Sequence, residues 1–87
     1  MNLGEANELR KELLDCHLKD KNGDEIKRIA IPNRDDSKYE GCALKLRKTR
    51  LDEVSFYQLE NICKEHKLQL KDIERKGCWT IYTPKKP

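Results

Sequence analysis

Four of the six residues from Lys45 to Arg50 are cationic, and the run lies where a strand-like pattern gives way to a helical one. Lysine and arginine side chains neutralise phosphate groups, and each such contact releases counterions from a nucleic acid. In the alternating segment, Lys45 and Arg47 face the same way. Lys48 and Arg50 follow in the turn towards the helix. We therefore expect Lys45 and Arg47 to belong to one cationic surface, with Lys48 and Arg50 at its edge.

Strand parity adds further residues to this surface. If helices cover the apolar face of a sheet, the opposite, open face carries four cations and two tyrosines but no carboxylate. Tyrosine rings offer flat faces on which unpaired bases stack. The residues expected on the open face are Arg28, Tyr39, Lys45, Arg47, Gln69, Lys71, Thr80 and Tyr82, and those expected to extend it are Arg75, Lys76, Lys85 and Lys86.

Cys63 and His66, three residues apart on the second helix, are candidates for a metal site or a nucleophile pair. Zinc sites usually contain closely paired ligands, and this chain has no such pair. Adjacent Cys16 and His17 point about 100° apart on a helix, so they do not easily bind one ion. We therefore expect no metal and no cofactor, with the lone cysteines as small core residues.

Catalytic motifs are scarce, because the four glycines are scattered singly and neither serine lies in a nucleophile-elbow motif. The catalytic alternative is a metal-independent ribonuclease. It would use His66 or His17 as the base, while Lys45 and Arg47 stabilise the charge of the phosphorane. We expect a binding protein rather than an enzyme, without catalytic residues.

The periodicity of apolar residues predicts the elements that position these side chains. A stripe at helical spacing predicts a helix over residues 2–19, with Asn2 as N-cap and Glu5 completing a capping box. A second helix follows the basic run to about His66, with Thr49 as its N-cap. A proline follows the first and the last of four predicted strands and ends each of them. The strands are Glu25–Ile31, Lys38–Arg47, Lys67–Glu74 and Cys78–Thr83.

The element order α-β-β-α-β-β predicts an α+β fold, a four-stranded antiparallel sheet with both helices packed on one face. A chain of 87 residues has room for one core, so we expect a single domain over residues 1–87, with 84–87 as a frayed basic tail. Either hairpin offers an edge strand, which leaves a monomer and a homodimer as alternatives. The helices should cover Ile29, Ile31, Cys42, Leu44, Leu46, Leu68, Leu70, Trp79 and Ile81.

Charge is spread unevenly, because the net charge of +3 divides into −2 over residues 1–40 and +5 over residues 41–87. This pattern indicates a cationic face more than a cationic protein. No apolar run approaches the roughly 20 residues that span a bilayer, and the N-terminus lacks the pattern of a secretory signal. Four widely spaced, single cysteines then favour reduced thiols, a cytoplasmic location and no membrane partner.

These features favour a small basic protein that binds nucleic acid, RNA or DNA, through the open sheet face and the basic strand–helix junction. Replacing Lys45 and Arg47 together should weaken binding without unfolding the chain. The alternative is a protein-interaction module, a small adaptor or inhibitor of a phage or mobile element. It would bind through Tyr39 and Tyr82 or pair through an edge strand. The RNA-recognition motif does not fit, because the strand from Glu40 to Leu46 lacks stacking aromatics.

Overall fold

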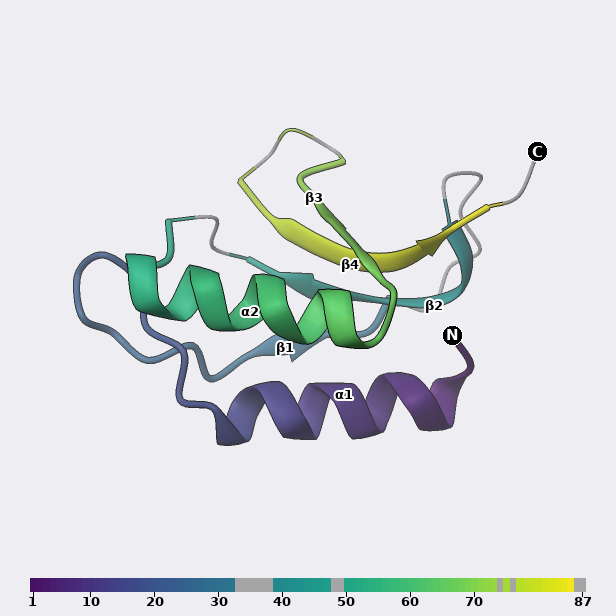
Figure 1. Ribbon diagram of the computed structural model, residues 1–87, viewed down its shortest axis with the longest axis horizontal. Helices are drawn as coiled ribbons and strands as arrows, with labels where there is room; N and C mark the ends of the chain where they lie inside the picture. The colour runs from purple at the N-terminus through teal and green to yellow at the C-terminus, as the bar shows by residue number, and fades with distance from the viewer. Residues whose placement is uncertain (33–38, 48–49, 74, 76, 86–87) are drawn as a thin grey trace.

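Two helices cover one face of a four-stranded antiparallel sheet in the computed structural model (Figure 1), which describes residues 1–32, 39–47, 50–73, 75 and 77–85. The elements are α1 (Leu3–Asp15), β1 (Ile29–Ala30), β2 (Tyr39–Leu46), α2 (Glu53–Glu65), β3 (Gln69–Lys71) and β4 (Trp79–Pro84). The strand order is β1-β2-β4-β3, so two longer central strands are flanked by short edge strands. The predicted α+β class, element order and packing are confirmed.

α1 begins at the predicted capping box. Asn2 Oδ1 accepts a hydrogen bond from the backbone N–H of Glu5 at 2.8 Å, and Glu5 Oε1 accepts one from the backbone N–H of Asn2 at 3.0 Å. These bonds satisfy donors that a helix start leaves without partners. The helix ends at Asp15 rather than the predicted Lys19, because His17 adopts a φ of 52° that a right-handed helix does not contain.

α2 begins at a different cap from the predicted one. Asp52 is the N-cap, because its Oδ1 accepts a hydrogen bond from the backbone N–H of Ser55 at 2.7 Å and its own backbone is extended. Hydrogen bonds from the backbone N–H and the hydroxyl of Ser55 hold the pKa of the Asp52 carboxyl below its ordinary value. The predicted cap, Thr49, lies outside the described residues.

The edge strands are shorter than predicted. β1 contains two residues of the predicted Glu25–Ile31, because the segment before Ile29 leaves the ladder with β2. β3 contains Gln69–Lys71 of the predicted Lys67–Glu74, and turns flank it on both sides. Short edge strands expose few unpaired backbone groups, which limits edge-to-edge association.

The central strands agree with the prediction to within about a residue. β2 pairs with β4 in a register that sets Leu44 opposite Ile81 and Tyr39 opposite Pro84. β4 therefore continues through Pro84, the first residue of the predicted frayed tail.

The main core lies between the helices and the sheet. All nine sheet residues predicted to face the helices belong to this core or pack against it. Leu44, Leu46 and Ile81 are fully buried, and Leu13 of α1 and Leu59 of α2 lie over them. Burial of these side chains is the main force that holds the helices on the sheet. No helix in the described ranges is long and apolar enough to cross a membrane.

A bulge interrupts β2 between Glu40 and Leu44. Gly41 within it has a φ of 67°, in the left-handed region that glycine adopts without a steric penalty. Met1 packs on the bulge, because its carbonyl oxygen accepts a hydrogen bond from the backbone N–H of Cys42 at 2.7 Å. A Cβ atom at Gly41 would collide with that carbonyl oxygen.

We predict that Gly41→Ala lowers the free energy of unfolding more than the control Gly23→Ala. Both glycines have a positive φ, 67° and 87°, so each substitution adds about 1 kcal/mol of backbone strain. At Gly41 the backbone of Met1 must also move, at a further cost of about 1–3 kcal/mol, whereas the space around Gly23 is open. Urea unfolding followed by circular dichroism measures both, and equal losses would contradict the bulge contact.

Candidate functional site

A hollow of about 430 Å³ opens at the β1 edge of the sheet, beside α1. An adjoining hollow of about 370 Å³ shares three of its lining residues. Cations dominate the lining of the first: Arg10 comes from α1, Lys27 and Arg28 from the segment that leads into β1, and Arg47 from the residue after β2. We refer to the surface formed by these four residues as the cationic hollow.

Arg28 and Arg47 are the two arginines that line both hollows. Arg28 directly precedes β1 and Arg47 directly follows β2, next to the Ile29–Leu46 pair of the ladder. Both residues are exposed. The fold therefore gathers two exposed arginines at this edge of the sheet.

The charge of the cationic hollow is not neutralised from within the described part of the chain. Arg10 Nη2 donates a hydrogen bond to Asn7 Oδ1 at 3.1 Å, which is a neutral partner. The other three cations form no ion pair with any described carboxylate. Glu25 lines the adjoining hollow, but its carboxylate contacts Nδ1 of His17. Positive charge is thus concentrated here and available to an anion.

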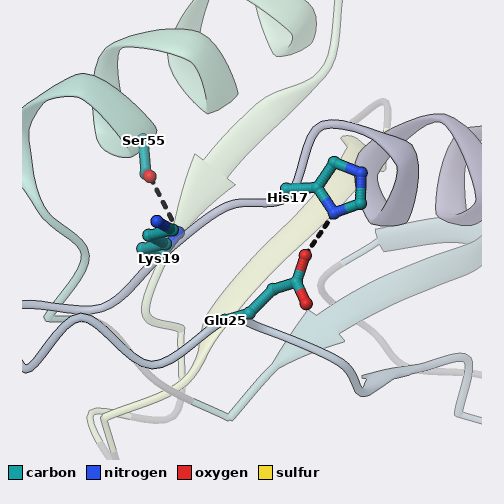
Figure 2. A network of polar contacts seen from close by, with 4 residues as sticks. All are labelled: His17, Lys19, Glu25 and Ser55. Atoms are coloured by element: carbon teal, nitrogen blue, oxygen red, sulfur yellow. Dashed lines mark hydrogen bonds and ion pairs between the residues drawn. The ribbon is translucent and has the colours of Figure 1, made fainter.

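The segment between α1 and β1 leads directly to two cations of the hollow, and Figure 2 shows how it is held. The hydroxyl oxygen of Ser55, in the first turn of α2, accepts a hydrogen bond from the backbone N–H of Lys19 at 2.8 Å. At the start of the segment, the ring of His17 points towards the carboxylate of Glu25, near the end of the segment, and contacts it through Nδ1. The segment is therefore held by one contact to α2 and by one contact between its own two ends.

A tight turn completes this segment. The buried carboxylate of Asp20 accepts hydrogen bonds from the backbone N–H groups of Asn22 at 2.9 Å and Asp24 at 3.0 Å. Such side-chain bonds to the following backbone are typical of aspartate in turns. The backbone N–H of Ile26 then donates to the carbonyl oxygen of Leu18 at 2.7 Å, which sets the direction of the chain as it enters the hollow.

The open face of the sheet is partly covered, in contrast to the prediction. Tyr39 and Tyr82 lie on the face that strand parity gives, but they are 4% and 7% exposed and pack on each other with ring centroids 6.2 Å apart. With Ala43 and the half-buried Ile73 they form a second apolar cluster. The prediction that both rings are exposed is wrong, because burial of their large apolar area is favourable once Ile73 lies against them.

The remaining predicted cations are spread along the molecule. Lys45 is half-buried between Ala30 and Thr80 in the middle of the sheet, and Lys71 is exposed on the β3 edge. Arg50, Arg75 and Lys85 are exposed but line neither hollow. Of the predicted cations, the structure brings together Arg28 and Arg47. Three of the predicted cations, Lys48, Lys76 and Lys86, lie outside the described part of the chain.

Two cations of the hollow are absent from the predicted set. Sequence periodicity assigns Arg10 to the solvent face of the first helix, yet it is half-buried one turn before Leu14, which also lines the hollow. Its position beside the apolar stripe is the signal that indicates an edge location. Lys27 falls inside the predicted first strand, but it precedes the observed ladder and turns into the hollow.

Cys63 and His66 do not form a joint site. Cys63 is 3% exposed, and burial, followed by the nearby charge of Glu60, raises the pKa of its thiol to about 11. A thiol with a raised pKa is a poor nucleophile and a poor metal ligand. Nε2 of His66 lies 3.2 Å from Oε2 of Glu12 on α1. The described residues contain no group of three side chains placed to hold a metal ion.

The other flank of α1 is acidic. A hollow of about 190 Å³ beside Met1 and Leu68 is lined by three glutamates of this helix, Glu5, Glu8 and Glu12. α1 thus separates a negative surface from the positive one at the β1 edge. A polyanion is repelled from one side of this helix and attracted to the other.

We predict that Ser55→Ala lowers the free energy of unfolding by about 1–2 kcal/mol, because the backbone N–H of Lys19 loses its acceptor in a partly buried position. Urea unfolding measures the loss. Gln58→Ala, at an exposed site on the same helix, serves as the control and should change stability by less than about 0.5 kcal/mol. A Ser55→Ala variant as stable as this control would show that the bond contributes nothing.

We predict that the Cys63 thiol resists alkylation in the folded protein at about pH 8, because a buried thiol with a pKa of about 11 is almost entirely protonated there. Iodoacetamide labelling followed by peptide mass spectrometry gives the rate at each cysteine. Labelling in urea is the control, in which Cys63 should react like an ordinary thiol. Fast labelling of Cys63 in the native protein would contradict this prediction and would make Cys63 a candidate nucleophile again.

Comparison with known proteins identifies no relative: no protein-family model, no curated protein and no solved structure matches this chain. The function of the cationic hollow therefore has to follow from its geometry and charge.

Proposed function

We propose that this protein binds nucleic acid through the cationic hollow. The observation that carries the proposal is that Arg28 and Arg47 line one hollow at the β1 edge together with Arg10 and Lys27. Four cations from three parts of the chain line one concave surface. No described carboxylate forms an ion pair with Arg28 or Arg47.

Phosphate is the anion that best fits such a set of groups. The planar guanidinium group donates two parallel hydrogen bonds to phosphate oxygens, and arginine is preferred where this bidentate contact matters. A phosphate bound in the hollow would neutralise part of the positive charge that Arg28 and Arg47 bring to it. Several phosphates along a nucleic-acid backbone would engage the remaining cations in the same way.

The charge pattern around α1 supports a polyanion that approaches from the β1 edge. The glutamates on the other flank of the helix, Glu5, Glu8 and Glu12, disfavour contact there. Opposed fields of this kind orient a charged ligand before contact and raise its association rate.

A protein-interaction module is the second candidate, and one observation favours it. Val54 and Tyr57 are 72% and 66% exposed and lie three residues apart on the outer face of α2. Two side chains are few beside the roughly 20 residues that each partner contributes to a standard interface. The cationic hollow therefore supports the first candidate more strongly. A cytoplasmic location, proposed with it, is supported by four free cysteines.

We predict that the double variant Arg28→Gln/Arg47→Gln binds a nucleic acid on the order of tenfold more weakly, or worse, than the unmodified protein at low salt. The slope of log affinity against log salt concentration should become shallower by about 2, because two phosphate contacts are lost. Fluorescence anisotropy with labelled RNA and DNA measures both quantities. Both arginines are exposed, so the urea midpoint should not change.

The matched control is Lys64→Gln/Lys67→Gln, which removes the same net charge at the far end of α2, where neither residue lines the hollow. This control should keep most of the affinity. Equal weakening in the two double variants would show that only net charge matters and would contradict a site at the hollow. Failure of the unmodified protein to bind any RNA or DNA at low salt would refute the proposed function.

A further inference from the structure

We propose that the nucleic acid taken by the cationic hollow is double-helical, bound through its sugar–phosphate backbones rather than through unpaired bases. This inference rests on the proposed function and adds the class of ligand. It follows from where the aromatic rings lie and from the charge of the hollow and of the sheet face beside it.

Proteins that bind single strands combine a positive groove with exposed aromatic rings on which successive bases stack. All five aromatic residues of this chain are within the described ranges, so their availability is fully defined. Tyr39 and Tyr82, the two rings on the face opposite the helices, are buried against each other and against Ala43. Neither ring offers a free face to a base.

The other three rings are also unsuited to stacking beside the hollow. Phe56 and Trp79 pack on each other, with ring centroids 5.6 Å apart, and both contact the main core. Tyr57 is 66% exposed, but it belongs to α2, and α2 contributes no residue to the hollow. The cations at the β1 edge therefore lack the aromatic partners that single-strand recognition requires.

The sheet face next to the hollow carries further positive charge. One row of residues crosses all four strands in register, in the order Ala30, Lys45, Thr80 and Lys71. Thr80 is 1% exposed and Lys45 is half-buried, so Lys71 is the exposed cation of this row. None of the described ladder residues on this face carries a carboxylate that would repel a phosphate backbone.

The charge density of a double helix suits contacts that are made to the backbone alone. A duplex carries one charge per about 1.7 Å of its axis, twice the density of one strand, so such contacts gain more from it.

Fluorescence anisotropy with three labelled probes of equal length tests the inference. The probes are a DNA duplex and an RNA duplex of about two helical turns, roughly 20 base pairs, and an unstructured oligothymidine strand. We expect both duplexes, or one of them, to bind at least about tenfold more tightly than the single strand at low salt. Equal or tighter binding of the single strand would overturn the duplex assignment while leaving nucleic-acid binding intact.

Two variants sharpen the outcome. Tyr57→Ala should leave the affinity for all three probes unchanged, and a selective loss of single-strand affinity would overturn the inference by exposing a stacking surface on α2. Arg28→Gln/Arg47→Gln should weaken duplex binding, and duplex binding that survives this change would overturn the hollow as its site. No binding of any probe would instead refute the proposed function itself, so the two failures are distinguishable.

Discussion

The pairing of Ile29 with Leu46 and of Ala30 with Lys45 is the contact on which the cationic hollow depends. It sets Ile29 beside Leu46 under the helices, and the residues next to this pair are Arg28 and Arg47, which both line the hollow. A strand of two residues is too short to hold a register alone. The preceding segment, fastened to α2 through the bond from Lys19 to Ser55, supplies the missing constraint. A slip by one residue would expose Ile29 and disperse the site.

Four cations line the hollow at this edge, and the fold tolerates their mutual repulsion because the two arginines next to the ladder are exposed. Charges in contact with solvent interact weakly through water and salt, so their repulsion reduces stability only slightly. The same exposure leaves Arg28 and Arg47 accessible to a ligand. Natural proteins often break a local rule where they bind something, and offset it elsewhere. Here the offset is the apolar core on the other face of the same strands, in which Leu44 and Leu46 are fully buried.

Local patterns in the sequence predict the faces of the sheet and the α1 cap correctly, because alternation and capping involve residues close in the chain. The cap of α2 is different, since the choice of Asp52 depends on Ser55, whose hydroxyl also anchors a distant segment. Strand parity assigns Tyr39 and Tyr82 to one face of the sheet but does not show what covers them. Ile73, which lies beyond the end of β3, packs against the cluster that the two rings form. Periodicity also does not predict that α1, the segment before β1 and the end of β2 meet at the hollow, because their meeting depends on the tertiary fold.

The most direct measurement of the central claim is a nuclear magnetic resonance titration of the isotope-labelled protein with a short nucleic-acid duplex. Backbone amide and arginine Nε–H shifts report which residues meet the ligand, independently of any substitution. We expect the largest changes at the four residues of the cationic hollow and smaller ones at Lys45 and Lys71. Changes that cluster around Val54 and Tyr57 on α2, with the hollow unperturbed, would contradict the assignment of the site.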